Sequence, residues 1–402
     1  MEKRTRNLRL VGRDEVSLGE LIHQTVRRTI EQAVEEELRA TLGAAPYERR
    51  AERSGYRNGT KTRALTGPTG PVELTLPRGR LTTSDGGTEE WTSTVVPRYQ
   101  RRMREVNEAV AGVYLSGGNT RRIRGALRPL LKGAPLSKSA VSRIVGTLRG
   151  EWEAWSKQSL ADLNVVYLYL DAIALRVRAA GRVTGLPVLA GVAVLSDGTK
   201  RLVSLEVCGA ESGSAWEGFL QGLTDRGLKA PRLCIIDGNA GLHRAISLAW
   251  RGTKIQRCAV HKLRNILRKA PQHAHGEITD DYHLIVYASG LEAATIARAA
   301  FVRKWSKRCP GAVESLNEAG DDLLTFYSFP KEQWKTIRTT NVIERINEEF
   351  RRRVKTQGSF PTESCALVLL YSLVASGQIN LRRLDGYEKL VDVVSREEDA
   401  AA

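Results

Sequence analysis

The middle of the chain alternates between short apolar runs and amphipathic stretches with helical spacing. Apolar runs bounded by turn formers predict strands, whereas apolar residues recurring with a helical period predict helices. The predicted strands are residues 164–170, 173–179, 188–195, 202–208, 233–236 and 254–260. The predicted helices are residues 213–223, 241–250 and 262–269, and Trp216, Phe219 and Leu220 are expected on the inner face of the first. This order predicts a mixed α/β sheet that lacks the regular alternation of a doubly wound fold.

The N-terminal stretch has a helical pattern over residues 16–42, with apolar residues along one face. They are Leu21, Ile22, Val26, Ile30, Val34 and Leu38. Such a helix either packs on its own domain or forms a dimer, and the pattern leaves both open. Residues 54–70 are rich in Gly, Arg and Pro and poor in core residues, which is typical of turns. One alternating strand, residues 72–76, follows them.

Three short helices are predicted at residues 104–115, 120–131 and 137–148. Glycines separate the first two, and Gly133-Ala134-Pro135 separates the second from the third. Ser137 is a suitable N-cap for the third helix. The side chains expected to be exposed near its start are Lys138, Ser139, Ser142 and Arg143. The pattern is typical of a helix-turn-helix module, and also of a small bundle that links two domains.

The charge of the chain changes this picture of a plain α/β protein. Lys and Arg number 62 and Asp and Glu 45, so the net charge is 62 − 45 = +17 and the pI is about 9.9. A strongly basic chain favours a polyanionic partner, above all nucleic acid, although a solvated basic surface is the simpler alternative. Arginine clusters at Arg101-Arg102, Arg121-Arg122 and residues 351–353 favour a long contact track over one basic tail.

Other compositional features narrow the class of protein. The five cysteines are scattered and odd in number, so no disulfide framework is indicated and a reducing cytosol is expected. No apolar run is long enough to cross a membrane, and no signal peptide pattern is present. We therefore expect a soluble, cytoplasmic protein. Neither a GxGxxG nor a GxxxxGK motif occurs, so a nucleotide cofactor is not expected.

Two aspartates, Asp171 and Asp237, directly follow apolar strands. A buried carboxylate is costly unless it is paired or bound to metal, and two at adjacent strand ends repel each other. With Glu344 as a third carboxylate, they would supply the oxygen ligands for two Mg²⁺ or Mn²⁺ ions about 3.5–4 Å apart. The simpler alternatives are a loop aspartate at Asp171 and an ordinary turn at Asp237-Gly238.

The stretch from residue 339 to 353 reads as a helix start followed by one polar face. Glu344, Asn347, Glu348 and Arg351 recur with helical spacing and share that face. An acid beside arginines in a basic chain suggests a carboxylate held near phosphates. Asn341 and Glu344 also have the spacing of a capping box, in which Glu344 would only satisfy backbone N–H groups.

A Cys258-x-x-His261 pair lies where the last strand meets a helix. It could be half of a zinc site, but no second pair of ligands stands at usable spacing. A helix-initial His261 among Arg257, Lys262 and Arg264 could instead donate to a phosphate.

Over nearly its whole length the chain resembles the Mutator-type bacterial insertion-sequence transposases, a family with a DDE triad on an RNase H-like fold. The motifs that carry the resemblance are Gly55-Tyr56-Arg57-Asn58-Gly59, Leu76-Pro77-Arg78, Leu170-Asp171-Ala172, Arg176-Val177-Arg178, Glu211 with Trp216, Ile236-Asp237-Gly238, residues 256–262, Thr339-Thr340-Asn341 with Glu344-Arg345, and Phe360-Pro361-Thr362. The family's triad falls on Asp171, Asp237 and Glu344, and its C-x-x-H signature on Cys258 and His261. Ala259 departs from the larger residue usual in the family.

The resemblance implies an α/β fold, with an RNase H-like catalytic domain that carries a mostly helical insertion and follows a helical N-terminal DNA-binding region. The domains expected on this basis are residues 1–100 for DNA binding or dimerisation, 101–160 for the three-helix module, 161–270 and 336–385 for the catalytic core, 271–335 for the insertion and 386–402 for a tail.

The resemblance also implies a reaction. Two Mg²⁺ or Mn²⁺ ions held by Asp171, Asp237 and Glu344 would activate water to cleave a transposon end, and the freed 3′-OH would then attack another phosphodiester. Cys258 and His261 would complete the active site, with His261 contacting a phosphate near the cut. The rival readings are a DNA-binding regulator that has lost catalysis and an RNase H-like nuclease that cuts without joining.

The expected partner is double-stranded DNA, both terminal inverted repeats and target, bound by a homodimer or higher oligomer in a nucleoid-associated bacterial protein. The residues expected to contact DNA are Arg57, Lys138, Ser142, Arg143, Arg176, Arg178, Arg257, Trp305 and Arg345. Among them, Trp305 would stack on a flipped base, unless it is buried in the core.

Overall fold

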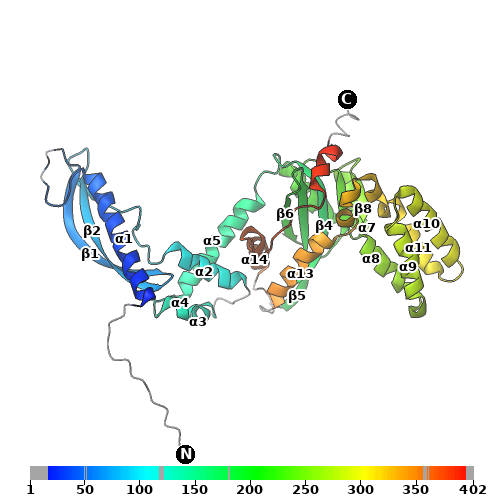
Figure 1. Ribbon diagram of the computed structural model, residues 1–402, viewed down its shortest axis with the longest axis horizontal. Helices are drawn as coiled ribbons and strands as arrows, with labels where there is room; N and C mark the ends of the chain where they lie inside the picture. The colour runs from blue at the N-terminus through cyan, green and yellow to red at the C-terminus, as the bar shows by residue number, and fades with distance from the viewer. Residues whose placement is uncertain are drawn as a thin grey trace, which may run out of the picture. The chain divides into compact units, whose positions relative to one another are not determined.

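The computed structural model describes residues 17–48, 50, 52–116, 122–179, 182–355, 360 and 362–394 (Figure 1). Arg121, Pro361 and the last part of the 386–402 tail lie outside these residues. The chain divides into two compact units, Met1–Val145 and Gly146–Ala402. Among the described residues, no helix is long and apolar enough to cross a membrane.

The N-terminal unit pairs a long helix with a small antiparallel sheet. Helix α1 (Leu18–Leu42) begins after Ser17, whose side chain accepts a hydrogen bond from the Glu20 N–H, and ends at Gly43 with a left-handed φ of 66°. The sheet has the order β1-β2-β3, with β1 (Gly55–Gly67), β2 (Gly70–Thr82) and β3 (Thr88–Glu90). The C-terminal half of α1 packs on β2.

The prediction that residues 54–70 are turn-rich and contain no strand was wrong. The N-terminal region expected to be helical, with one strand, contains a three-stranded sheet beside α1. Strand β1 pairs with β2 along almost its full length, and a tight turn at Pro68-Thr69 joins them. Because β1 is an edge strand whose middle is exposed, it lacks the apolar alternation that marks β2. On β2, Val72, Leu74 and Leu76 are buried against α1.

Helix α1 uses only part of its apolar face within its own unit. Val34, Leu38 and Leu42 are buried, whereas Leu21 is 54% exposed and Ile22 42% exposed. The helix therefore packs on its own domain through its second half. Dimerisation through its first half stays a prediction.

The three predicted helices are observed as four. They are α2 (Arg104–Leu115), α3 (Ile123–Ala126), α4 (Arg128–Leu131) and α5 (Lys138–Ser156). The second predicted helix is interrupted at Leu127, because Pro129 in the first turn of α4 cannot donate a backbone hydrogen bond to the preceding turn. Helix α5 extends further than predicted, and the division between the two units falls within it.

The C-terminal unit is built on a five-stranded mixed sheet of order β6-β5-β4-β7-β8. Its strands are β4 (Val165–Ala179), β5 (Arg182–Leu195), β6 (Lys200–Val207), β7 (Leu233–Ile236) and β8 (Lys254–Arg257). The pairs β4–β5 and β5–β6 are antiparallel, whereas β7 runs parallel to both β4 and β8.

Strands β4 and β8 differ from the prediction in ways that affect the site, and β5 and β6 also begin earlier than predicted. Strand β4 continues through Asp171, which pairs with Ala190 of β5, so Asp171 does not stand at a strand end. However, β7 pairs with β4 only from Tyr167 to Tyr169, so Asp171 lies just beyond its parallel neighbour. Strand β8 ends at Arg257 rather than at residue 260, because Cys258 turns the chain into the next helix.

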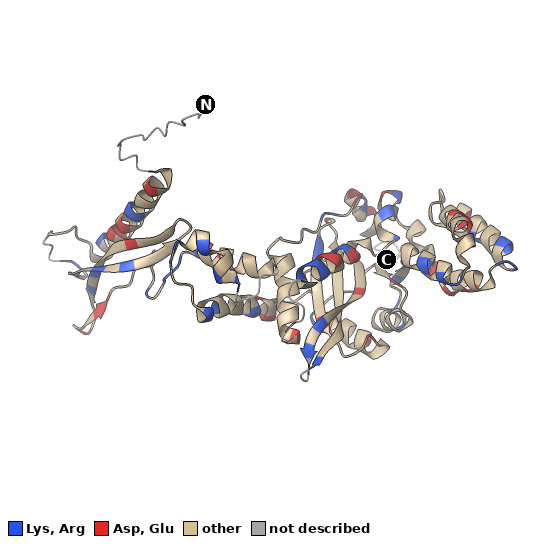
Figure 2. Cartoon of the chain, turned by 90° about the horizontal axis from the view of Figure 1, so that it is seen from below, with Lys and Arg blue, Asp and Glu red and all other residues tan. Residues whose placement is uncertain are grey.

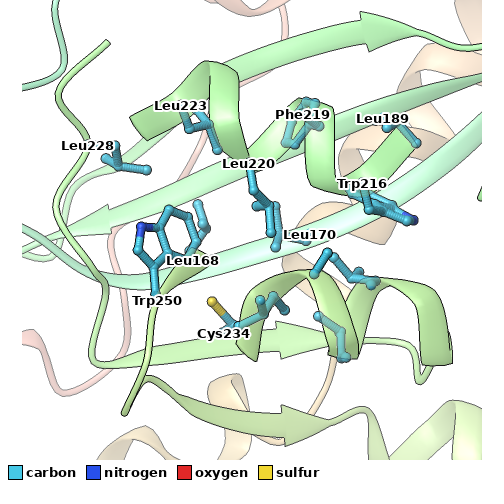
Figure 3. Close-up of a cluster of buried hydrophobic side chains, with 14 of the residues drawn as sticks. Leu168, Leu170, Leu189, Trp216, Phe219, Leu220, Leu223, Leu228, Cys234 and Trp250 are labelled. Carbon is cyan, nitrogen blue, oxygen red and sulfur yellow. The ribbon is translucent and has the colours of Figure 1, made fainter. Parts of the chain in front are cut away.

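Helices α6 (Gly213–Asp225) and α7 (Ala240–Ala249) cover one face of this sheet. Figure 3 shows Trp216, Phe219 and Leu220 of α6 against Leu168 and Leu170 of β4, all fully or almost fully buried. The predicted inner face of α6 is thereby confirmed. This core holds β4 and β7 side by side, which positions Asp171 within β4 and Asp237 after the end of β7.

The remaining chain is helical. Helix α8 (Ala259–Arg268) follows β8, and between residues 272 and 337 come α9 (His275–Val286), α10 (Leu291–Trp305), α11 (Pro310–Glu318), α12 (Trp334–Ile337) and short 3-10 turns. Helix α13 (Asn341–Lys355) then packs against β4, and α14 (Glu363–Ala375) contacts β4 and β6. In this way residues far apart in the sequence return to β4, the central strand, which carries Asp171.

Candidate active site

Asp171 lies on β4, and Asp237 directly follows the end of the neighbouring strand β7. Burial, and after it the charges of Asp237 and Glu344, together raise the pKa of Asp171 to about 7. His261 acts in the opposite direction on the same pKa. The three acids and His261 therefore share one electrostatic environment.

The Asp171 carboxylate is held by two hydrogen bonds. Its Oδ1 accepts from the Ala172 N–H at 2.9 Å, and its Oδ2 accepts from Nδ2 of Asn347 at 2.8 Å. Asn347 lies on α13, one turn after Glu344, and is 1% exposed. Its Oδ1 is buried and has no hydrogen-bond partner among the described residues. The helical spacing had placed Asn347 on the face of Glu344, but sequence reasoning did not identify it as a site residue.

Glu344 stands in the first turn of α13, and Thr340 Oγ1 donates a hydrogen bond of 2.6 Å to its Oε1. Its backbone N–H donates to the Thr340 carbonyl in the ordinary helical manner. Within the described residues, no hydrogen bond joins the side chain of either Asn341 or Glu344 to the backbone N–H of the other, so the capping-box alternative is not what the structure has. The charge of Glu344 contributes to the raised pKa of Asp171.

Cys258, His261 and Glu344 form a compact group whose ligand atoms all lie within 4.8 Å of one another. Oxygen Oε1 of Glu344 is 3.6 Å from Nδ1 of His261. Cys258 is fully buried, and its Sγ accepts a hydrogen bond from the Thr340 N–H at 3.3 Å. Thr340 Oγ1 lies 3.2 Å from the same sulfur, but its single hydroxyl hydrogen is donated to Glu344 Oε1.

The charges of Cys258 and His261 support each other. Burial alone would raise the pKa of the Cys258 thiol, but hydrogen bonds from His261 and Thr340 outweigh it and lower that pKa. The hydrogen bond to Cys258 raises the pKa of His261 against the opposing effect of burial, and Glu344 and Asp237 add to the rise. The imidazole is thus favoured in its cationic form beside the carboxylates.

Asp237 is supported from behind by the loop that follows it. The Asn239 N–H donates to Asp237 Oδ1 at 3.1 Å, and Asn239 Oδ1 caps α7 by accepting from the Gly241 and Leu242 N–H groups. Asn239 Nδ2 in turn donates to Glu211, which also accepts from Trp216 Nε1. Glu211 and Trp216, noted in the sequence as part of a motif, therefore brace the loop that carries Asp237.

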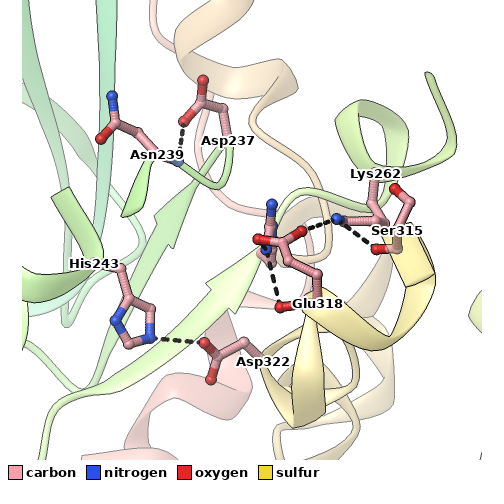
Figure 4. Close-up of polar contacts among 8 residues, drawn as sticks. Asp237, Asn239, His243, Lys262, Ser315, Glu318 and Asp322 are labelled. Atoms are coloured by element: carbon pink, nitrogen blue, oxygen red, sulfur yellow. Dashed lines mark hydrogen bonds and ion pairs between the residues drawn. The ribbon is translucent and has the colours of Figure 1, made fainter. Parts of the chain in front are cut away.

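Figure 4 shows an ionic network on the other side of Asp237. Glu318 of α11 binds Arg257 Nη1 at 2.6 Å and Lys262 Nζ at 2.5 Å, and Lys262 also donates to the Ser315 carbonyl. Gly238 has a φ of +110°, and a Cβ there would lie 2.2 Å from Arg257 Nε. Arg257 is thus packed directly on the turn that follows Asp237, and α11 fixes it there.

The residues predicted to contact DNA differ in exposure: some are exposed, and others are bound within the protein. Arg345 is exposed beside Glu344 on α13, and Lys138, Ser142 and Arg143 are exposed on α5. Arg176 and Arg178 are exposed, but they alternate with the buried Ile173, Leu175 and Val177, so they occupy the face of β4 opposite Asp171. Two others are engaged within the protein: Arg57 is half-buried and 2.7 Å from Glu35, and the Arg257 side chain is only 12% exposed.

Trp305 takes the alternative left open for it in the sequence analysis, a place in the core, rather than one where it could stack on a base. Trp305 is fully buried on α10, donates from Nε1 to Asp281 at 2.8 Å and has Arg308 4.3 Å over its ring. The packing of α10 on α9 needs a large side chain at this position, and the helical spacing alone could not show which face it would take.

Residues 2–383 match the family described as "Transposase, Mutator family". The chain is 34% identical to the transposase for insertion sequence element ISRM5 of Rhizobium meliloti (strain 1021), over 92% of this chain and 91% of that protein. It is 31% identical to the transposase for IS1081 of Mycobacterium tuberculosis, over 87% and 84%. It is 30% identical to the transposase for IS256 in transposon Tn4001 of Staphylococcus aureus, over 81% and 82%.

A solved chain of the Drosophila P element transposase strand transfer complex aligns with 75% of this chain and 87% of its own length. Its sequence identity is 10% and its TM-score 0.29, values too low to support an argument about fold or function.

Proposed function

The chain belongs to the Mutator family of transposases, and from that premise we propose that it mobilises a bacterial insertion sequence by DDE chemistry. It binds the terminal inverted repeats, cleaves DNA at the element's ends by metal-dependent hydrolysis and joins the freed 3′-OH by strand transfer. The single observation that carries this proposal is that Asn347, on the helix of Glu344, donates a hydrogen bond to Asp171, which lies on the strand next to the one that Asp237 follows.

An RNase H-like catalytic core is part of the same proposal. The sheet order β6-β5-β4-β7-β8, with three antiparallel strands followed by two parallel ones, supports it. The helical stretch between residues 272 and 337 separates β8 from the Glu344 helix, as an insertion into such a core would. The N-terminal unit is assigned to DNA binding, and the pairing of two transposon ends calls for at least a dimer.

Asp171, Asp237 and Glu344 would hold two Mg²⁺ or Mn²⁺ ions, since hard cations prefer oxygen ligands. The residues fit this group, because the burial and crowding that raise the pKa of Asp171 are relieved by a bound cation. When bound, two such ions stabilise the attacking and leaving oxygens of an in-line displacement.

The protein's own side chains prepare the site for this chemistry. Asn347 and the Ala172 N–H orient Asp171, Thr340 orients Glu344, and the Asn239 N–H holds Asp237. The pKa of His261, whose side chain is 29% exposed, is raised, which favours the cationic form that would donate to a phosphate oxygen of the bound strand. Such preorganised donors and charges are worth more in a buried site than in water.

A strand-transfer assay tests the proposal. Oligonucleotides with the element's terminal repeats, a target plasmid and Mg²⁺ are incubated with the wild-type protein and with Glu344→Gln. We expect nicked ends and joined products from the wild type only. Cutting without joining would instead identify an RNase H-like nuclease, and binding without cutting would identify a DNA-binding regulator.

A further inference from the structure

The N-terminal unit contains a basic groove with a volume of about 950 Å³. Its walls come from β1, from the loop of residues 97–102 and from the start of α5. The six cationic residues that line it are Lys61, Arg63, Arg98, Arg101, Arg102 and Arg143. No Asp or Glu is among its lining residues. Figure 2 shows that Lys and Arg occur throughout both units. What distinguishes this groove is that its basic residues are not accompanied by Asp or Glu.

The loop that forms one wall is held in place by the protein. Arg63 donates to three backbone carbonyls of the loop, those of Val96 at 3.3 Å, Pro97 at 3.1 Å and Gln100 at 2.8 Å. The backbone of Thr66 on β1 bonds to Arg101 and Met103 on either side of the loop's end. The groove is therefore a preformed feature of the unit, and Arg63 is a positioning residue within it.

Three of the groove's cations are exposed and have no hydrogen bond or ion pair to another side chain in the described part of the chain: Lys61, Arg101 and Arg143. Arg102 is half-buried between them, and burial together with the charges of Arg143 and Arg101 lowers its pKa. Like charges held this close destabilise the unit unless an anion neutralises them. The groove is thus built for a ligand with several negative charges.

We propose that this groove holds the sugar–phosphate backbone of duplex DNA, with Arg101 and Arg143 each contacting a phosphate. The inference rests on the proposed function and specifies where the N-terminal unit contacts its DNA. Single-stranded DNA is bound through several stacked aromatic side chains. The groove has one, Tyr99, and Arg98 lies 5.3 Å over its ring. Its chemistry therefore fits backbone contacts that are independent of sequence.

Salt dependence tests this inference on the full-length protein. Binding of a duplex carrying a terminal repeat, and of a scrambled duplex, is measured in EDTA at several salt concentrations for the wild type, Arg101→Ala, Arg143→Ala and the double variant. Each lost phosphate contact should lower the slope of log K against log salt by about 1, and the double variant should lose about 2. The loss should be equal for the two duplexes. Arg28→Ala, which removes an exposed cation of α1 outside the groove, should leave the slope unchanged.

The inference is overturned if the double variant keeps the wild-type slope, if Arg28→Ala lowers it equally, or if the wild type binds no duplex. Tighter, groove-dependent binding of single-stranded DNA of the same length would overturn the choice of duplex. If the wild type performs strand transfer but the variants keep the wild-type slope, the groove is not the DNA contact and the proposed function stands. If the variants have reduced slopes but the wild type performs no strand transfer, the groove contacts DNA and the proposed function fails.

Discussion

Asn347 and Asp171, 176 positions apart in the sequence, are joined by a hydrogen bond of 2.8 Å from Nδ2 to Oδ2. The bond connects the helix of Glu344 to the strand of Asp171. If the amide were turned around, its oxygen would face the carboxylate, so the observed orientation suits an ionised Asp171. In this orientation the Oδ1 of Asn347 is buried and has no hydrogen-bond partner among the described residues.

Asn347→Leu should separate the positioning of Asp171 from the stability of the fold. It removes the donor to Asp171 but also a buried polar oxygen without a partner, so the net change in unfolding free energy should stay within about 1–2 kcal/mol. An Asp171 held only by the Ala172 N–H should bind Mg²⁺ more weakly, with a several-fold higher half-saturating concentration. Calorimetric Mg²⁺ titration of the DNA-free protein measures this directly. An unchanged titration would show that Asn347 only fills space.

Glu344→Gln should fold and bind transposon ends but neither nick nor join DNA in Mg²⁺. Its amide oxygen can still accept from Thr340, so the local contact survives while the negative charge is lost. We expect a loss of at least about 10²-fold in cleavage, the scale of one electrostatic interaction made in the transition state. Asp171→Asn and Asp237→Asn should behave alike in the same nicking assay. If Glu344→Gln cleaved normally while Asp171→Asn did not, Glu348 would be the next acid to examine.

His261→Ala should lower cleavage while leaving the fold and DNA binding intact. The reason is the proposed contact between a cationic imidazole and a phosphate. The competing hypothesis is a zinc ion held by Cys258, His261 and Glu344, whose ligand atoms are close enough together. Metal analysis of the purified protein decides between them. Stoichiometric zinc that disappears in His261→Ala would favour the zinc site.

Glu318→Gln should destabilise the C-terminal unit by about 1–3 kcal/mol in a denaturant titration. Lys262, whose side chain is 1% exposed, would keep its charge and lose its carboxylate partner. The expected loss of unfolding free energy is modest because the Glu318 side chain is 55% exposed to water. Adding Lys262→Met should recover most of the loss, because it removes the unpaired buried cation. If the double variant were no more stable than Glu318→Gln, the cost would lie elsewhere.

Trp305→Phe should leave binding to transposon ends unchanged. The substitution keeps an aromatic ring in the core and loses the hydrogen bond to Asp281, at a cost of about 1 kcal/mol. Trp305→Ala should cost about 3–5 kcal/mol by leaving a cavity. A selective loss of cleavage in Trp305→Phe, with the melting temperature preserved, would revive a role for this ring at the DNA.

The sequence by itself determined those features whose causes are local. The apolar run of residues 233–236 is a buried strand with the same bounds in the structure, and it places Asp237 at the strand's end. The amphipathic pattern of α6 placed Trp216, Phe219 and Leu220 in the core. Helical spacing put Glu344 and Asn347 on one face of α13. Each of these follows from the periodicity of a single element.

Only the tertiary structure decided which of these faces meet and which charges are neutralised. Asn347 approaches Asp171, and Glu318 approaches Arg257 and Lys262, because α13 and α11 pack back on the sheet after long connections. Strand β1 exists because β2 supplies its hydrogen bonds, although its own residues favour turns. Trp305 is buried because α9 covers it. Pairing between distant segments is a property of the packed chain, and no local pattern in the sequence records it.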